Sequence, residues 1–200
     1  MVETYLRQSP LAHLHLIARA REPDSVTAGV RLDERSFRRQ FVLRGDADDA
    51  AFVAAVEREL GTPLALLPNT VAGDTVRVIW LGPDEWLVVA DPDIDLGAKL
   101  DAVTNNRHAA VSDVSESRTI LTLGGTRARA VLAKGCALDF HASAFGPASC
   151  AQSMLAKAHV ILHQTSDAPQ FEIYVHRSFA EYLWAWLEDA SAEYGLTIGQ

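Results

Sequence analysis

From residue 37 onward, the spacing of hydrophobic positions changes repeatedly between that of a strand and that of a helix. Runs of β-branched and aromatic residues bounded by turn residues predict strands, and apolar residues three or four positions apart predict helices. The predicted strands are 37–43, 75–81, 86–90 and 109–114, and the predicted helices are 52–60 and 93–105. These elements follow the order βαββαβ.

The same order is predicted again in the second half, although the two halves share little sequence. A helix is expected after the turn at Gly124 and Gly125, and another from Ser178 to the end of the apolar pattern. Two split βαβ units packed together make an α+β protein with antiparallel or mixed sheets. The predicted strands of this half are 119–123, 154–163 and 170–175, with a short segment at 196–198 that closes the sheet.

Residues 1–35 carry a weaker pattern. Pro10, Pro23 and Gly29 interrupt a scatter of charged residues around one apolar run. The expected organisation is therefore an N-terminal arm at 1–35 with one extended segment, a first α+β subdomain at 36–115 and a second at 116–200.

Composition narrows the class of protein. The chain has 200 residues, with 18 Lys and Arg against 26 Asp and Glu, a net charge of −8. A negative protein lacks the attraction that draws proteins to phosphate backbones, so nucleic acid is not expected as a partner. No apolar run approaches the length of a membrane helix, and the first residues lack the layout of a signal peptide, so a cytoplasmic protein is expected. Cys136 and Cys150 match no disulfide scaffold or metal motif and are interpreted as small core residues.

Two features suggest ligand binding, and each has a structural alternative. Gly124 and Gly125, with Arg127 and Arg129 nearby, resemble a phosphate cradle at a helix start, but no GxGxxG or Walker sequence is present. A glycine turn is the alternative. His159 and His163 would share a helix face as metal ligands, but their apolar neighbours favour a strand, which separates them by about 13 Å. The pair His13 and His15 is interpreted as surface histidines.

Three further features are weighed in the same way. Cys136 and His141 suggest a reactive thiol, and a buried thiol is the alternative. Asp113 lies just beyond a strand, where it suits either a site or a turn cap. The tripeptide from Arg44 to Asp46 has the letters of an adhesion motif, but a strand exit explains it. No convincing catalytic group emerges.

Tryptophans are the more informative feature. If the last helix buries its apolar face, Trp184 points roughly 130° away from the centre of that face and is expected outside the core. Trp80 and Trp86 bracket a short hairpin, and a sheet with one covered face does not easily bury both. Because exposed tryptophans often anchor interfaces, Trp184, Trp80 and Trp86 are candidate interface residues, with a partly covered core edge as the alternative. The expected apolar face of the helix is Phe179, Tyr182, Leu183, Trp186, Leu187 and Ala190.

Several distinctive motifs follow one another along the chain. They are Leu81-Gly82-Pro83-Asp84-Glu85-Trp86-Leu87, Asp113-Val114-Ser115 with Arg118-Thr119, Leu132-Ala133-Lys134-Gly135-Cys136-Ala137-Leu138-Asp139-Phe140-His141, and Arg177-Ser178-Phe179-Ala180 with Tyr182-Leu183-Trp184. In this order they resemble the gamma subunit of heterotetrameric sarcosine oxidase, and the resemblance runs from near Ser9 almost to the C-terminus. The gamma subunit in turn is similar to the folate-binding domain of the glycine-cleavage aminomethyltransferase, so the resemblance implies an aminomethyltransferase-like fold.

The resemblance implies a part in the oxidative demethylation of sarcosine to glycine. Oxygen is reduced to hydrogen peroxide, and the one-carbon unit passes to tetrahydrofolate as 5,10-methylenetetrahydrofolate. It also implies alpha, beta and delta subunits as partners, with FAD, FMN, NAD, tetrahydrofolate and zinc held on those subunits. The gamma subunit has no cofactor assigned to it.

The sequence departs from the aminomethyltransferase pattern at one informative place. Those enzymes carry a GYTGE-type stretch ahead of a Phe-Glu strand, and here the residues from His163 to Gln170 lack its glycines and glutamate. The strand beginning at Phe171 and Glu172 is kept. No catalytic, cofactor-binding or metal-binding residue is therefore carried over, and Asp167 is only a weak substitute for the missing acid.

Two hypotheses of different class follow. The first is a non-catalytic structural subunit that buries the candidate tryptophans and part of the arm against other subunits. The second is a free-standing folate-dependent aminomethyl or methyl transferase, or a folate-binding protein. Folate binding by the isolated chain distinguishes them.

Overall fold

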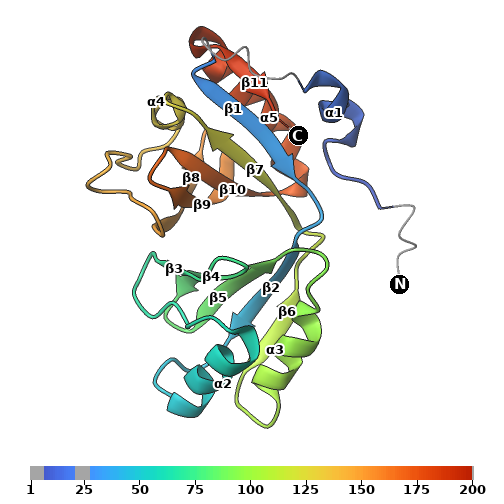
Figure 1. Ribbon diagram of the computed structural model, residues 1–200, viewed down its shortest axis with the longest axis vertical. Helices are drawn as coiled ribbons and strands as arrows, with labels where there is room; N and C mark the ends of the chain where they lie inside the picture. The colour runs from blue at the N-terminus through green and yellow to red at the C-terminus, as the bar shows by residue number, and fades with distance from the viewer. Residues whose placement is uncertain (1–6, 21–27, 200) are drawn as a thin grey trace. The chain divides into compact units, whose positions relative to one another are not determined.

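The computed structural model describes residues 7–20 and 28–199, which form two compact units, each with its own sheet (Figure 1). The middle unit comprises Phe37–Ser117 and Ala148–Gln152. The terminal unit comprises the described parts of Met1–Ser36, Arg118–Pro147 and Ser153–Gln200. Both units combine helices with a sheet, so the predicted α+β class is confirmed.

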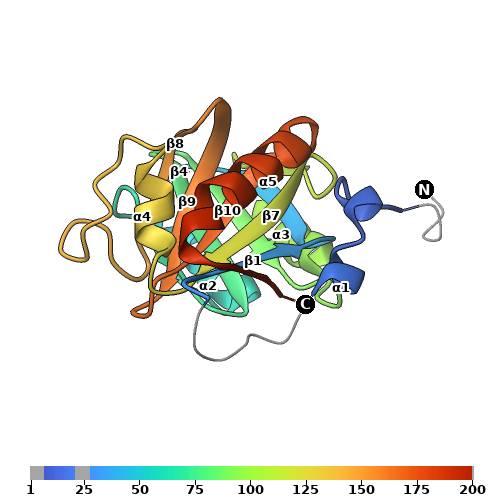
Figure 2. The same cartoon turned by 90° about the horizontal axis from the view of Figure 1, so that it is seen from above.

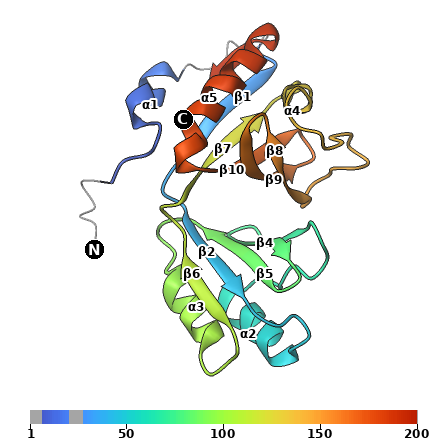
Figure 3. The ribbon, with the colours of Figure 1, turned by 180° about the vertical axis from the view of Figure 1, so that it is seen from behind.

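The middle unit has a five-stranded antiparallel sheet in the order β3-β4-β5-β2-β6. Figure 3 shows its two helices side by side against this sheet, and they contact each other. The order of elements agrees with the βαββαβ prediction, with one very short strand added at the edge. The elements are β2 (Arg39–Arg44), α2 (Ala50–Leu60), β3 (Val71–Ala72), β4 (Val76–Gly82), β5 (Glu85–Ala90), α3 (Leu96–Thr104) and β6 (Ala110–Asp113).

Local sequence explains where α2 begins and ends. The Asp49 carboxylate accepts a hydrogen bond of 2.8 Å from the backbone nitrogen of Ala51 and so caps the helix start. Gly61 ends the helix at a φ of 68°, a left-handed conformation that glycine adopts at low cost. Between these caps, Phe52, with the other apolar residues of one face, packs into the core of the middle unit.

The terminal unit has a six-stranded sheet in the order β11-β1-β7-β10-β9-β8. Figure 2 shows α5 lying across this sheet, where it contacts β1, β7 and β10. The edge strand β11 pairs in parallel with β1, which agrees with the expectation that 196–198 closes the sheet. The elements are η2 (Ala12–Leu14), α1 (Leu16–Arg19), β1 (Val30–Arg35), β7 (Arg118–Gly124), α4 (Ala128–Ala133), β8 (Cys150–Leu155), β9 (Ala158–Ser166), β10 (Gln170–His176), α5 (Arg177–Ser191), η3 (Ala192–Tyr194) and β11 (Leu196–Ile198).

The extended segment expected within residues 1–35 is present as strand β1, which lies inside the sheet between β11 and β7. Another expectation for this unit is wrong. The single strand expected at 154–163 is two strands, because the chain turns between Leu155 and Ala158, where Ala156 has a φ of 51°.

The buried face of α5 also differs from the expected one. Phe179 and Tyr182 are exposed, at 43% and 38% of their surface. Apolar residues occupy more than half of this helix, so spacing alone does not decide which part packs on the sheet. At 100° per residue, the observed face spans about 120°, from Ala190 to Trp184. The buried residues of the helix are Ala180, Leu183, Trp184, Leu187, Ala190 and Ser191.

Within residues 7–20 and 28–199, none of the helices combines the length and the apolar character that a membrane span needs.

Candidate functional site

The three candidate interface tryptophans have different positions in the fold. Trp184 and Trp86 are buried, with 1% and 0% of their surface exposed. The expectation that Trp184 lies outside the core is wrong, because the helix packs through the face on which Trp184 lies. Trp80 is half-buried and packs at the border of the core of the middle unit. Of the three, only Trp80 keeps part of its ring exposed, and its interface role stays a prediction.

A buried polar cluster lies on one face of the terminal unit's sheet. Glu172 on β10 is 1% exposed and pairs across the sheet with Thr122 on β7 and His163 on β9. The hydroxyl of Tyr174 donates a hydrogen bond of 2.6 Å to Oε2 of Glu172. The guanidinium of Arg35 on β1 donates to Oε1 over 3.3 Å. One bond to the carboxylate therefore comes from β10 itself and the other from β1, which lies beyond β7 in the sheet.

The cluster stabilises the buried negative charge of Glu172 through hydrogen bonds. A carboxylate is costly to bury unless it is paired and hydrogen-bonded, and here a phenol and a guanidinium serve both oxygens. His163 Nδ1 lies 3.9 Å from Oε2 of Glu172 and is buried without a hydrogen-bond partner among the described residues. The sequence placed Glu172 in a strand but did not predict this cluster, since Arg35 and His163 come from other strands.

The glycine turn and its arginines have structural roles. Gly125 has a φ of 107°, and a Cβ there would lie 2.4 Å from the carbonyl oxygen of Gly29. The guanidinium of Arg129 donates to Gln164 Oε1 over 3.0 Å and to the carbonyl oxygens of Phe140 and Phe145. These bonds tie the loop after α4 to the sheet. The turn therefore fits the alternative interpretation, a glycine turn rather than a phosphate cradle.

The histidine pair of β9 takes the strand geometry that the sequence favoured. His159 is exposed and His163 is buried. His13 and His15 lie in and beside the short helix η2. Throughout the part of the chain that the structure describes, no three His, Cys, Asp or Glu side chains gather in a way that could hold a metal ion.

Asp113 and the cysteines also take structural positions. Oδ1 of Asp113 accepts a hydrogen bond of 2.9 Å from the backbone nitrogen of Ser115, which fits the turn cap, one of its two interpretations. Cys136 and Cys150 are both free and buried. Burial raises the pKa of the Cys150 thiol to about 12, so this thiol stays protonated at neutral pH.

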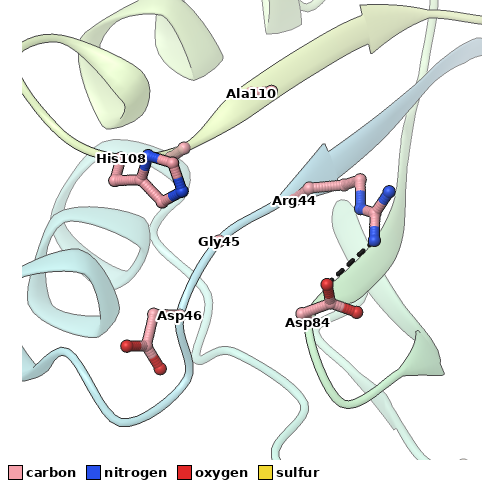
Figure 4. Close-up of a pocket in the computed structure, with 7 residues that line it drawn as sticks. Arg44, Gly45, Asp46, Asp84, His108 and Ala110 are labelled. Atoms are coloured by element: carbon pink, nitrogen blue, oxygen red, sulfur yellow. Dashed lines mark hydrogen bonds and ion pairs between the residues drawn. The ribbon is translucent and has the colours of Figure 1, made fainter.

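A hollow of about 480 Å³ opens at the end of β2 in the middle unit. Figure 4 shows Arg44 and Asp84 together on one side, with His108 and Asp46 on the other. Arg44 and Asp84 form an ion pair of 2.8 Å. The hydrogen bond and the charge of Asp84 raise the pKa of the exposed Arg44 guanidinium. Asp46 accepts a hydrogen bond from the backbone nitrogen of Asp48 and so serves the chain itself. The hollow is wide and exposed, and its charged groups serve local structure.

The tripeptide from Arg44 to Asp46 lies beside this hollow, where the chain leaves strand β2. The backbone nitrogen of Gly45 donates to the carbonyl oxygen of Asp84 over 3.1 Å. A Cβ at Gly45 would lie 2.4 Å from the ring of Phe52, so only glycine fits between the strand and α2. Packing explains this glycine without an adhesion function.

Comparison with known proteins identifies the family. A sequence model of the sarcosine oxidase, gamma subunit family matches residues 44–193. The chain belongs to this family. The predicted resemblance is therefore confirmed, and the chain is a subunit of sarcosine oxidase, an oxidoreductase.

Curated relatives support the same assignment. The sarcosine oxidase subunit gamma of Corynebacterium sp. (strain P-1) is 35% identical over 193 residues, which cover 96% of this chain and 93% of the relative. The sarcosine oxidase subunit gamma of an Arthrobacter species is 36% identical over 196 residues, which again cover 96% of this chain and 93% of the relative. The similarity spans both units.

Solved structures agree with the fold. A chain of the heterotetrameric sarcosine oxidase from Corynebacterium sp. U-96, in complex with pyrrole 2-carboxylate, matches with a TM-score of 0.84 and 33% identity over 94% of this chain and 96% of that one. The glycine cleavage system aminomethyltransferase T from Bartonella henselae matches with a TM-score of 0.65 and 18% identity, over 97% of this chain and 59% of that one. The second likeness shows a shared fold only.

Proposed function

We propose that the gamma-family chain is a non-catalytic structural subunit of a heterotetrameric sarcosine oxidase. The observation that carries this proposal is its 33% identity and TM-score of 0.84 to a chain of a heterotetrameric sarcosine oxidase. The partners would be the alpha, beta and delta subunits, in the cytoplasm.

The complex would oxidise sarcosine at its methyl group. Sarcosine, oxygen and tetrahydrofolate give glycine, hydrogen peroxide and 5,10-methylenetetrahydrofolate, so two electrons pass from the substrate to oxygen and the methyl carbon passes to the folate. FAD, FMN, NAD, tetrahydrofolate and zinc would be held by the other subunits. The reaction would serve sarcosine catabolism and one-carbon metabolism.

The side chains of this chain support a structural role. Glu172 is bonded by Tyr174 and Arg35, and Arg129 is bonded to two carbonyl oxygens and to Gln164. Groups that are already satisfied inside the chain have little capacity left for a substrate. Asp167 lies exposed in the turn between β9 and β10.

The alternative is a folate-dependent aminomethyl or methyl transferase, or a folate-binding protein. Its support is the fold shared with an aminomethyltransferase and the presence of one buried carboxylate on the sheet of the terminal unit. Fold alone does not carry function, because one scaffold hosts many activities.

Co-expression tests the proposal. The chain is produced with tagged alpha, beta and delta subunits from the same source, and the complex is isolated by affinity and size-exclusion chromatography. We expect the chain to co-elute at a constant ratio with the flavin absorbance. Titration of the isolated chain with tetrahydrofolate in a calorimeter should give no saturable heat. Failure to co-elute, together with saturable folate binding, would establish the alternative.

A further inference from the structure

The loop between α2 and β3 exposes two adjacent leucines. Leu66 and Leu67 are 53% and 71% exposed, whereas the preceding Leu64 and Ala65 are 5% and 4% exposed and belong to the core of the middle unit. The loop therefore passes from the core to the surface between Ala65 and Leu66, and the side chains that it exposes there are apolar.

The base of this loop is fixed from the core. The indole nitrogen of Trp86 donates a hydrogen bond of 2.8 Å to the carbonyl oxygen of Ala65. The hydroxyl of Thr62 donates to the carbonyl oxygen of Val76 over 3.1 Å. Both donors are buried, so the chain entering the leucine pair has one position.

The far side of the loop is fixed by a strand edge. The hydroxyl of Thr70 donates to the carbonyl oxygen of Leu67 over 2.7 Å. Backbone bonds then join Val71 to Ala148 and Cys150 to Asn69, at 2.8 and 2.9 Å. The leucines are therefore held between two anchored ends. A surface that is already ordered loses less conformational entropy on binding than a mobile one.

Charge shows what kind of surface fits this patch. The middle unit has fourteen Asp and Glu against seven Lys and Arg, so it holds seven of the eight net negative charges of the chain. No charged residue occurs between Gly61 and Gly73. An uncharged apolar centre in an acidic unit matches the general layout of an interface, with an apolar core and a polar rim. Its electrostatic complement is a basic surface.

We propose that Leu66 and Leu67 are the apolar centre of the surface through which the middle unit docks on another subunit of the sarcosine oxidase assembly. The partner surface is an apolar pocket rimmed by Lys and Arg. This inference rests on the proposed function, since it requires that the chain assembles. Trp86, expected at an interface, is then a positioning residue that holds the docking loop from inside.

The test uses the complete assembly. The chain is co-expressed with tagged partner subunits as wild type, as Leu66→Ser with Leu67→Ser, and as Leu67→Ser alone. The control is Met154→Ser, which changes a 39% exposed apolar residue of β8 in the terminal unit, outside both the loop and the N-terminal arm. We expect the tagged subunits to retain at least about tenfold less of the double variant than of the wild type. The single variant should give an intermediate amount, and the control should equal the wild type. Circular dichroism and thermal melting verify that each variant is folded.

Each outcome has a distinct meaning. If the tagged subunits retain the folded double variant as well as they retain the wild type, the inference is overturned and the proposed function stands. Absence of wild-type retention would overturn the proposed function itself. Self-association of the purified chain that the double variant abolishes would make a second copy the occupant, against the proposal. If the association rate of the chain with its partners does not fall when the salt concentration is raised from 50 to 500 mM, the Lys and Arg rim proposed for the partner surface is contradicted.

Discussion

The indole nitrogen of Trp86 donates a hydrogen bond of 2.8 Å to the carbonyl oxygen of Ala65. This bond joins the core of the middle unit to the residue that precedes the exposed Leu66. Trp86 is 0% exposed and its ring lies 6.0 Å from that of Phe52, between centroids. One buried side chain therefore supports both the packing of α2 and the course of the neighbouring loop.

The substitution Trp86→Phe tests this link. It removes the donor and part of the ring, and leaves the Ala65 carbonyl without its partner, so we expect a loss of about 2–4 kcal/mol in the free energy of unfolding. Amide exchange at Ala65, Leu66 and Leu67 should accelerate more than elsewhere in the unit. The matched control is Trp184→Phe, because the buried indole nitrogen of Trp184 has no hydrogen-bond partner among the described residues. Equal exchange in the loop of both variants would contradict the anchoring role.

Trp184 should behave as a core residue. It is 1% exposed on the packed face of α5, so Trp184→Ala leaves a large cavity and should cost about 3–5 kcal/mol. Below its lowered melting temperature, the folded variant should still be retained by tagged partner subunits. Thermal melting and pull-down at low temperature measure the two effects separately. Loss of retention with an unchanged melting temperature would restore the interface interpretation.

Local signals in the sequence were sufficient for several elements. Helix α2 has a capping Asp49 and a terminating Gly61, both within a few residues of the chain they control. The β4–β5 hairpin reverses at Pro83 and Asp84, between two β-rich runs. Such elements depend on neighbours in the sequence, so their spacing and turn residues predict them.

Other features depend on partners far away in the chain. Strand β1 is recognisable only through pairing with β7 and β11, which lie more than 80 residues later. The buried face of α5 was predicted wrongly for a related reason. Phe179 and Tyr182 are hydrophobic residues like those that pack on the sheet, so the helix sequence alone does not distinguish the two faces. Only the sheet decides between the two faces.

The candidate sites show the same limit. A lone acid in an apolar strand was the signal for the Glu172 cluster, but its bonds to Arg35 and Tyr174 needed coordinates. The exposed Leu66 and Leu67 likewise follow two buried apolar residues, Leu64 and Ala65, and their composition does not distinguish the two pairs.

The Tyr174 hydroxyl should stabilise the buried carboxylate of Glu172. Tyr174→Phe keeps the ring and removes the 2.6 Å bond, so we expect a loss of about 1–3 kcal/mol in urea unfolding. Tyr182→Phe is the control, because Tyr182 is 38% exposed, and it should change stability by less than about 0.5 kcal/mol. Equal effects of the two variants would show that the cluster does not depend on the phenol.

Cys150 should be an unreactive thiol in the folded protein. Burial raises its pKa from the ordinary 9.0 to about 12, so the thiolate that reacts with disulfide reagents is scarce at pH 8. Because the folded state holds this proton more tightly than the unfolded state, stability should fall as pH rises from about 9 to about 12. A Cys136→Ala variant leaves Cys150 as the single thiol for labelling. Rapid native labelling at pH 8, as fast as in urea, would contradict the raised pKa.

Gly125 should tolerate no side chain. Its φ is 107°, and an added Cβ would lie 2.4 Å from the carbonyl oxygen of Gly29, which also accepts a hydrogen bond from Arg127. Gly125→Ala therefore combines backbone strain with displacement of β1, and we expect a cost of about 3 kcal/mol. Gly61→Ala is the control with open space around its Cβ and a φ of 68°, and it should cost about 1 kcal/mol from the backbone alone. If urea unfolding gave equal losses, contact with Gly29 would not be what requires glycine at this turn.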